Sequence, residues 1–442
     1  MTDVNMRSLA LDILLAVNED GQYSHLLLNQ VLEKYQYLPK RERAFLTRLV
    51  EGTLERQITL DYVIDAFSKT KVHKMKPVIR NLLRLGAYQI MYMNSVPDSA
   101  AVSEAVKLAK KRGFIGLSGF VNGVLRSIAR DGGSRVEWPN GREKPVEALS
   151  IAYSIPRWIV QMWADAYGMD KTREILSGFS EEPGFSIRVN VQKTTPEQLI
   201  KELRGEGLTV EQLSMPCALF VSGVDYLRGL KSFQEGKFYV QDVSSMRVAE
   251  LVDVQPGDYV IDVCAAPGGK SLHLSELLNG TGMVEARDLT GRKVELIGEN
   301  LRRHGAQNVR AVQMDASVHD EDSVEKADVL VCDLPCSGLG VLGRKPDIRY
   351  RMSMEQAKEL SLLQRAILAT TQDYVKRGGT LVYSTCTIHP AENEENVAWF
   401  LRGYPEYELI YEEQIFPGGE NRDGFFMAKL KRGTKETERI FK

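Results

Sequence analysis

Two cysteines are the residues of this sequence whose type and position best suit covalent chemistry. Cys336 stands in Asp-Leu-Pro-Cys-Ser-Gly and Cys386 in Ser-Thr-Cys-Thr, and each motif follows a short apolar run. A thiolate is a strong nucleophile, and residues that follow strands lie where open α/β sheets bind their ligands. No Cys-x-x-Cys or histidine pair accompanies the two cysteines, so we expect no metal site. We interpret both as reactive residues, and Cys217 and Cys332 as core residues.

A glycine-rich turn is the second candidate for a functional element. It follows an apolar run, leads into a helical pattern and consists of Cys264, Ala265, Ala266, Pro267, Gly268, Gly269 and Lys270. Small residues let the backbone approach a ligand closely, and the free N–H groups of a helix N-terminus point toward it. The turn has neither the G-x-x-x-x-G-K-S/T nor the G-x-G-x-x-G spacing, which disfavours nucleoside triphosphates and dinucleotides. Its lysine is a candidate for helping a thiol to ionise.

Two acidic residues follow the next two apolar runs. Asp288 comes after 283–286, and Asp315 comes after 309–313. At the end of a second strand a carboxylate could take ribose hydroxyls, and after a third strand it could reach an adenine amino group. Either residue alone is more commonly a loop residue or a helix cap. Their shared position at consecutive strand ends favours a nucleoside site.

The elements that must position these residues alternate between strands and helices from residue 236 onward. We expect strands at 259–263, 283–286, 309–313, 329–332 and 380–383, and helices at 270–278, 291–303 and 355–377. Strands separated by helices predict a parallel, doubly wound α/β sheet. The ligands of such a sheet bind beyond the carboxyl ends of its strands.

The remainder of the chain divides into two further segments. Apolar residues recur at helical spacing throughout 4–130, which predicts an all-α domain. Residues 146–235 mix strands at 185–190 and 218–221 with a helix at 195–203, which predicts a small α+β module. We therefore expect a multidomain chain with domains at 1–132, 146–235 and 236–442, the first two joined by a linker rich in turn residues.

Composition and charge limit the class of protein. The chain is 43% hydrophobic and 26% charged with a net charge of −2, which is typical of a globular protein and excludes low-complexity disorder. No run approaches the roughly 18 apolar residues of a membrane span, and no signal peptide is expected. Five cysteines fit a reducing compartment, so we expect a cytoplasmic protein without membrane contact, and a monomer.

The charge is unevenly distributed along the chain. Residues 1–135 contain 20 lysines and arginines against 13 aspartates and glutamates, an excess of +7. The basic residues form clusters at Lys69, Lys71, Lys74 and Lys76, at Arg80 and Arg84, and at Lys107, Lys110, Lys111 and Arg112. Any one cluster is more commonly a solvated helix face, but the sum favours contact with nucleic acid. We expect residues 1–130 to bind RNA and to take no part in catalysis.

Taken together in this order, the motifs resemble those of RNA cytosine-C5 methyltransferases that use S-adenosylmethionine. They are Asp-x-Cys-Ala-Ala-Pro-Gly-Gly-Lys, Asp-x-Pro-Cys-Ser-Gly and Ser-Thr-Cys-Thr, with similar blocks at 393–397 and 423–428. The helical segment is similar to the NusB-type RNA-binding fold, notably at 96–102 and 120–126. Their fusion is the arrangement of the bacterial 16S rRNA methyltransferases called Sun, Fmu or RsmB, and the resemblance covers nearly the whole chain.

The resemblance implies a Rossmann-like catalytic domain with defined residue roles. It makes 264–270 the loop that binds S-adenosylmethionine, with Asp288 at the ribose, Asp315 at the adenine side, and Asp333 at the methionine end or the cytosine ring. Cys386 would add to C6 of cytosine, and Cys336 would assist product release. An arginine directly before Asp288 departs from the usual apolar residue.

The resemblance also implies a substrate. It implies 16S rRNA, free or in a partly assembled small subunit, with cytosine 967 as the target, and a basic segment at 344–350 that could grip RNA phosphates.

Three alternatives differ in substrate or activity. A DNA cytosine-C5 methyltransferase would use Cys336 as the nucleophile and would not need Cys386. An RNA enzyme could act on tRNA or 23S rRNA instead of 16S rRNA. A non-catalytic RNA-binding factor could keep the methyltransferase fold as a scaffold, although it would then need neither cysteine.

Overall fold

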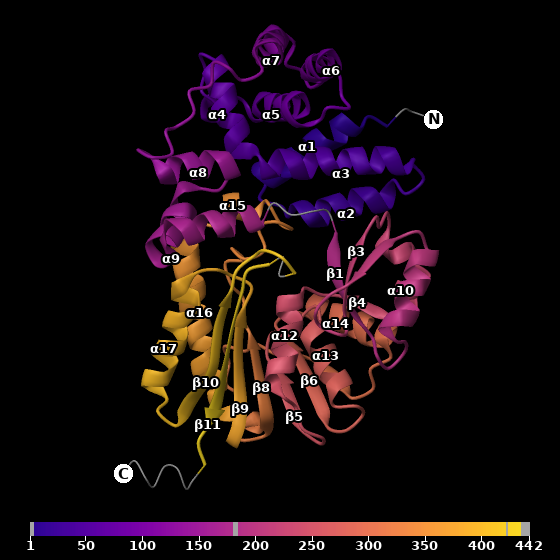
Figure 1. Ribbon diagram of the computed structural model, residues 1–442, viewed down its shortest axis with the longest axis vertical. Coiled ribbons are helices and arrows are strands. Elements are labelled where there is room, and N and C mark those ends of the chain that lie inside the picture. The colour runs from indigo at the N-terminus through magenta and orange to yellow at the C-terminus, as the bar shows by residue number, and fades with distance from the viewer. Residues whose placement is uncertain (1–3, 180–183, 421–422, 435–442) are drawn as a thin grey trace. The chain divides into compact units, whose positions relative to one another are not determined.

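The computed structural model describes residues 4–179, 184–420 and 423–434. The chain forms two compact units, each of which is discontinuous in sequence (Figure 1). Unit 1 consists of Met1–Leu176 together with Arg344–Arg351, and unit 2 consists of Ser177–Gly343 together with Met352–Lys442. The chain therefore passes from one unit to the other three times.

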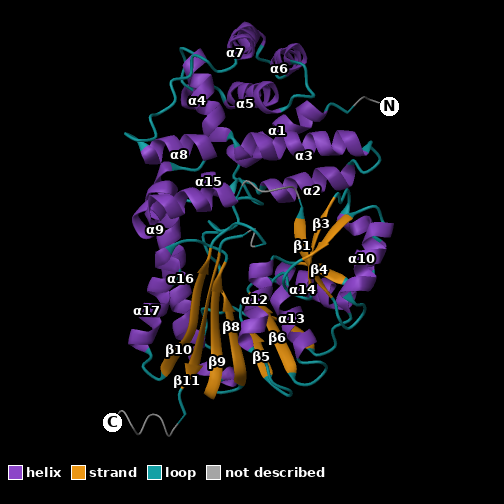
Figure 2. Cartoon of the chain, viewed as in Figure 1, coloured by secondary structure: helices purple, strands orange, loops and turns teal. Residues whose placement is uncertain are grey.

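Unit 1 is helical throughout its described part, as the spacing of apolar residues predicted (Figure 2). Its α-helices are α1 (Met6–Asn18), α2 (Ser24–Lys34), α3 (Lys40–Glu55), α4 (Gln57–Phe67), α5 (Pro77–Tyr92), α6 (Asp98–Lys111), α7 (Ser118–Asp131), α8 (Pro145–Tyr153), α9 (Arg157–Gly178) and α15 (Ile348–Arg351). One apolar cluster forms the core, and Leu14, Leu49 and Leu83 are fully buried in it. The core consists of the apolar stripes of amphipathic helices.

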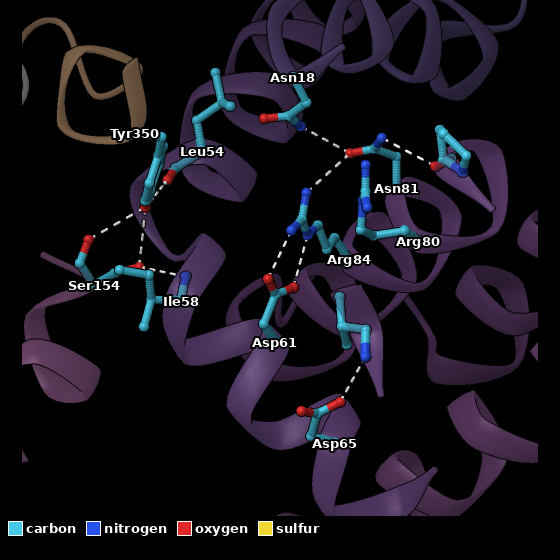
Figure 3. A network of polar contacts seen from close by, with 12 residues as sticks. Asn18, Leu54, Ile58, Asp61, Asp65, Arg80, Asn81, Arg84, Ser154 and Tyr350 are labelled. Atoms are coloured by element: carbon cyan, nitrogen blue, oxygen red, sulfur yellow. Dashed lines mark hydrogen bonds and ion pairs between the residues drawn. The ribbon is translucent and has the colours of Figure 1, made fainter. Parts of the chain in front are cut away.

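Helix α5 is the most deeply buried helix of unit 1, because even its polar residues are enclosed. The Arg84 guanidinium makes two hydrogen bonds to the Asp61 carboxylate, at 2.6 and 2.7 Å (Figure 3). Asn18 donates to the Asn81 Oδ1 atom at 2.9 Å. A buried charge is tolerated only when it is paired in this way. Arg84 is therefore a structural residue, and the prediction that it belongs to a basic surface is wrong.

A small antiparallel sheet begins unit 2. Its order is β2-β3-β1-β4, and its strands are β1 (Phe185–Val189), β2 (Thr209–Gln212), β3 (Ala218–Ser222) and β4 (Phe238–Val240). Helix α10 (Pro196–Gly205) begins where the Thr195 side chain accepts the Gln198 N–H. The predicted α+β module is confirmed, while β2 and β4 are too short to be recognised from their sequence.

A seven-stranded sheet of order β10-β11-β9-β8-β5-β6-β7 forms the centre of unit 2. Its strands are β5 (Tyr259–Asp262), β6 (Met283–Asp288), β7 (Val309–Gln313), β8 (Ala327–Asp333), β9 (Val375–Thr385), β10 (Tyr407–Ile415) and β11 (Phe425–Arg432). Its α-helices are α12 (Val243–Val252), α13 (Gly269–Leu277), α14 (Gly291–His304), α16 (Met354–Thr371) and α17 (Glu394–Gly403). The five predicted strands are all present, and they pair in parallel.

Two expectations about this sheet are wrong. The sheet is mixed, because β11 runs antiparallel to both β9 and β10. Only nine residues separate β10 from β11, too few for the crossover that a parallel pair requires. The helix predicted to reach residue 377 ends at Thr371, because β9 already begins at Val375 and continues the register of β8.

Candidate active site

The carboxyl ends of β8 and β9 bring the two candidate cysteines together. These strands are neighbours, with Asp333 paired to Ser384 in parallel register. Cys336 lies three residues beyond the end of β8, and Cys386 lies directly after β9. Their sulfur atoms are 3.3 Å apart, and both side chains are partly exposed. Fifty residues of sequence separate two thiols that form one site.

The surroundings of Cys336 shift its pKa. The hydrogen bond to Cys386 and burial hold the pKa of the Cys336 thiol well above its ordinary value, and the nearby Glu392 acts in the same direction. Cys336 therefore keeps its proton, and either sulfur can be the donor in the contact between the two thiols. A thiolate on Cys386 is the form that a Cys336 donor stabilises. The nearby Cys332 is fully buried in β8, and burial raises its pKa to about 12, which fits the prediction of a core residue.

A buried polar network holds the loop after β8. The Glu392 carboxylate accepts the Ser337 N–H at 2.9 Å and the Gln364 amide at 3.0 Å. The Ser337 and Thr387 hydroxyls are 2.7 Å apart and link the two strand ends. None of these side chains is exposed, so the network ties the first residues of the loop after β8 to the end of β9.

A second network holds the end of β9. The Asn393 side chain accepts from the Thr385 hydroxyl at 2.6 Å and donates to the Thr387 carbonyl at 3.1 Å. Asn393 belongs to the block at 393–397, for which the sequence suggested no role. Asn393 and the preceding Glu392 thus position the two cysteines.

Lys270 and Asp333 join the glycine-rich loop to the β8 end. The Lys270 ammonium lies 2.7 Å from Asp333 Oδ2, and Asp333 Oδ1 accepts the Ser384 hydroxyl at 2.8 Å. The ammonium also lies 5.2 Å from the centre of the Phe425 ring. Because a carboxylate compensates the charge of Lys270, this residue is poorly placed to help a thiol ionise. The role that its contacts support is to hold the Asp333 side chain in position.

The glycine-rich loop has the close approaches that its sequence suggested. Gly268 has a φ of 103°, in the left-handed region, and a Cβ on Gly269 would lie 2.8 Å from the Tyr239 ring. The Ala266 N–H donates to Asp288 Oδ2 at 3.0 Å, and the Leu289 N–H donates to Asp288 Oδ1 at 2.8 Å. Asp288 thus lies beside the loop and fixes it. The Lys293 ammonium lies 3.0 Å from Oδ1, so Oδ2 is the oxygen that can accept a further hydrogen bond.

Asp262, the last residue of β5, is a site residue that the sequence reasoning missed. It is almost fully buried, and its Oδ2 accepts the Ser271 hydroxyl at 2.6 Å. Its Oδ1 has no hydrogen-bond partner among the described residues. Burial raises the pKa of Asp262 to about 7. The aspartate that opens the first motif was the available signal. An unpaired buried carboxylate oxygen calls for a donor on a ligand.

Asp315 and Arg287 lie at a small pocket beside the same sheet edge. Asp315 is exposed and accepts both the N–H and the hydroxyl of Ser317, which lowers the carboxyl pKa. Both residues line the pocket with Val263, Met314, Ala316, Thr371 and Tyr374. Arg287 is the arginine that stands before Asp288 in place of the usual apolar residue, and its contacts account for its burial. It donates to Glu285 and Ser323, each at 2.6 Å, and its guanidinium lies over the Tyr374 ring.

One group of described residues has the donor types of a metal site. Potential ligand atoms of Cys217, Glu250 and His273 all lie within 4.8 Å of one another. His273 Nε2 is already 3.2 Å from Glu250, and burial together with the charge of Arg188 lowers the His273 pKa to about 4. The three residues come from separate segments, so no spacing in the sequence announces them.

The basic segment at 344–350 is not the uniform phosphate-binding surface that the sequence suggested. Arg349 is only 4% exposed, and burial lowers its pKa. The Arg349 guanidinium contacts backbone carbonyls of unit 1. The prediction is therefore wrong for Arg349, while Arg344 and Lys345 are exposed.

Models of three protein families match the chain in succession. Residues 4–130 match the NusB family, residues 155–224 match the ferredoxin-like domain of RsmF/B-like methyltransferases, and residues 249–431 match the 16S rRNA methyltransferase RsmB/F model. The fold and site thus define an S-adenosylmethionine-dependent RNA methyltransferase.

Close relatives extend over the full chain. The probable ribosomal RNA small subunit methyltransferase B of Bacillus subtilis is 38% identical, covering 98% of this chain and 100% of the relative. The ribosomal RNA small subunit methyltransferase B of Proteus mirabilis is 30% identical, with 97% and 99% covered. The chain belongs to the RsmB family of 16S rRNA methyltransferases.

Solved structures support the same fold. The crystal structure of PH0851 superimposes with a TM-score of 0.81 at 26% identity and covers 97% of this chain and 99% of its own. NSun6 from Pyrococcus horikoshii with SFG has a TM-score of 0.57 at 24% identity, covers 63% of this chain and 98% of its own, and supports the fold alone. Among the described residues, no helix is long and apolar enough to cross a membrane.

Proposed function

We propose that this protein transfers a methyl group from S-adenosylmethionine to C5 of a cytosine in 16S rRNA, and that the cytosine is the one numbered 967 by family resemblance. The observation that carries the proposal is the pair of thiols 3.3 Å apart at the ends of two adjacent parallel strands, beside the glycine-rich loop. One nucleophile and one separate proton-transfer group are what the C5 reaction needs.

In the proposed mechanism, Cys386 acts as the nucleophile and Cys336 as the second thiol. The Cys386 thiolate forms a bond to C6 of the cytosine, which makes C5 nucleophilic. Bound S-adenosylmethionine supplies the electrophilic methyl group that C5 takes. A base then removes the C5 proton, and the C6–sulfur bond breaks with its electrons returning to Cys386. Cys336, which keeps its proton in the resting pair, gives this proton to the departing Cys386 sulfur, and the Cys336 thiolate is then the base that takes up the C5 proton.

The residues of the loop at 264–270 fit the cofactor. The unpaired Oδ1 of Asp262 offers a buried acceptor at the loop. In the proposal Asp288 takes the ribose hydroxyls and Asp315 reaches the adenine side, since it lines the adjacent pocket. Asp333, fixed by Lys270, faces the methionine end or the cytosine ring.

The RNA would be bound mainly by unit 1. Its exposed lysines at 69, 71, 74 and 76 support this role. Arg84 does not contribute, because it is buried and paired with Asp61, while Arg80 and Arg112 are partly engaged by Glu19 and Asp12. The monomeric state, the cytoplasmic location and the choice between free and partly assembled 16S rRNA stay predictions.

The direct test is transfer of a labelled methyl group to RNA. Purified protein with labelled S-adenosylmethionine should label 16S rRNA lacking the modification, but neither tRNA nor 23S rRNA. Bisulfite mapping of the product should then place the mark at one cytosine. If only tRNA or only 23S rRNA were labelled, that RNA and not 16S rRNA would be the substrate. If no RNA were labelled, the result would favour a non-catalytic RNA-binding factor.

A further inference from the structure

Eight residues of the catalytic half of the sequence are a structural part of unit 1. The segment Arg344–Arg351, which we call the anchor, follows the loop that carries Cys336 and precedes α16. It contains the short helix α15. The rest of the sequence from 177 to 442 belongs to unit 2, so the anchor is the one excursion of the catalytic half into the helical unit.

The anchor is held by specific hydrogen bonds. Asp347 is only 1% exposed and accepts the Ser24 hydroxyl at 2.5 Å. The Tyr350 hydroxyl donates to the Leu54 carbonyl at 2.6 Å and lies 3.1 Å from the Ser154 hydroxyl (Figure 3). These partners come from α2, α3 and the turn after α8, so the anchor joins three separate parts of unit 1.

Arg349 contributes three further contacts to the anchor. Its guanidinium lies 3.3 Å from each of three carbonyl oxygens, those of Glu55, Tyr153 and Ser154. Glu55 and Tyr153 are the last residues of α3 and α8. The last carbonyls of a helix lack partners within it and carry the negative end of its dipole. The carbonyls at the two helix ends therefore partly compensate the charge of this buried guanidinium.

The other end of the connection is fixed beside the nucleophile. The Gly340 N–H donates to the carbonyl of Cys386 at 3.1 Å, and its own carbonyl accepts the Gly424 N–H at 2.7 Å. A Cβ on Gly340 would lie 1.9 Å from the Gly424 oxygen, so only glycine fits. Three residues then separate Gly340 from the anchor, a span of at most about 15 Å even if fully extended.

We propose that unit 1 takes part in catalysis through the anchor, with Arg349, Tyr350 and Asp347 as positioning residues that hold the loop of Cys336 against Cys386. The inference rests on the proposed function and deepens it. Unit 1 is then more than an RNA-binding module, and removing it would release the anchor and loosen the two-cysteine site. This proposal replaces the expectation that residues 1–130 take no part in catalysis.

The test compares two matched substitutions in full-length protein. Arg349→Met removes the charge from the anchor, while Arg84→Met removes a similarly buried charge from the same unit, where its partner is Asp61. We expect Arg349→Met to slow covalent Cys386–RNA adduct formation at least tenfold at saturating RNA and S-adenosylmethionine. Cofactor affinity should stay within twofold, and Arg84→Met should keep the wild-type rate. Equal slowing by both substitutions, or by neither, would overturn the proposal.

A milder substitution covers the case in which Arg349→Met does not fold. Tyr350→Phe removes only the hydroxyl that donates to Leu54, and we expect a rate about three- to tenfold lower. The rate at which a thiol reagent labels Cys336 should change in the same variant, and a wild-type labelling rate together with a wild-type adduct rate would contradict the inference. If the wild-type protein forms no adduct with any RNA, the proposed function fails first, which distinguishes the two failures.

Discussion

At the scale of the residue, the site depends on an unequal pair of thiols. Cys336 keeps its proton because its contact with Cys386, its burial and the nearby Glu392 all raise its pKa. Two thiols with separate protonation states can do two tasks, addition and elimination. The sequence showed that both cysteines follow strands, but not that their sulfur atoms meet, since this depends on the neighbouring positions of β8 and β9.

Replacing the two cysteines one at a time should separate these tasks. Cys386→Ala should abolish turnover and leave no covalent protein–RNA species. Cys336→Ala should still form the C6 bond and methylate, then fail to release, so a denaturant-resistant band should accumulate with S-adenosylmethionine present. A denaturing gel with an rRNA fragment is the measurement. A band from Cys386→Ala alone would support the DNA-type assignment and refute ours.

Replacing Asp288 should weaken cofactor binding. In Asp288→Ala the N–H groups of Ala266 and Leu289 lose their acceptor. Under the proposed function, the ribose hydroxyls of the cofactor lose theirs as well. A lost charged acceptor costs about 1.5–3 kcal/mol, so the affinity measured by calorimetry should fall roughly 10- to 150-fold. Asp315→Ala is the comparison, and it should have a smaller effect because Asp315 is exposed. An unchanged affinity in Asp288→Ala would remove this residue from the site.

At the scale of the element, regular patterns were predictable and edges were not. Strands β5 and β8 were found because buried strands are continuous apolar runs, and α14 was found because a surface helix shows its apolar stripe. Strand β10 reads Tyr-Glu-Leu-Ile-Tyr-Glu-Glu-Gln-Ile, a polar edge strand without clear alternation. Its position depends on pairing with β11, which is a tertiary contact that local sequence does not encode.

The junction of α14 with the small sheet should make unit 2 sensitive to acid. His304, the last residue of α14, packs beside Tyr239 and Asn190. Burial, followed by the charges of Arg303, Arg188 and Lys193, lowers its pKa to about 2. A histidine that stays neutral when folded but gains a proton when unfolded removes stability as the pH falls below about 6.5.

The expected loss from His304 is about 1.4 kcal/mol per pH unit between roughly pH 6.5 and the lowered folded pKa. Urea unfolding of the wild-type protein at about pH 7 and about pH 5.5 should show it. His304→Gln should lose less stability over the same interval, although it starts from a lower value. Equal pH dependence in both proteins would show that His304 is not the group responsible.

At the scale of the whole molecule, family resemblance predicted more than physical reasoning could. Helical periodicity gave the class of unit 1, and strand–helix alternation gave the class of the catalytic sheet. Neither pattern indicated that the anchor belongs to unit 1. In the sequence, the segment that contains Arg349 and Tyr350 looks like any other short basic segment. A buried arginine is distinguished from an RNA-binding arginine only by the carbonyls around it, and these come from distant residues.

The exposed lysines of unit 1 should control affinity for RNA. Replacing Lys74 and Lys76 with alanine should weaken rRNA binding, and the slope of log affinity against log salt should decrease by about one for each phosphate that is no longer neutralised. Filter binding at several salt concentrations is the measurement. Alanine at Lys201 and Lys231, exposed lysines of unit 2, should leave the slope close to wild type. An equal decrease of the slope in both variants would show that RNA binding is not specific to the lysines of unit 1.

The discontinuity of unit 1 also has a consequence for biosynthesis. The ribosome completes the first segment of unit 1 at Leu176 and must then add the 167 residues from Ser177 to Gly343 before the anchor is synthesised. At about 5–20 residues per second this takes roughly 10–30 s. During that interval the last carbonyls of α3 and α8 cannot accept hydrogen bonds from the Arg349 guanidinium, so they must accept them from water. The helical unit, although translated first, is therefore completed only after most of the catalytic sheet has been made, so its maturation is tied to that of its neighbour.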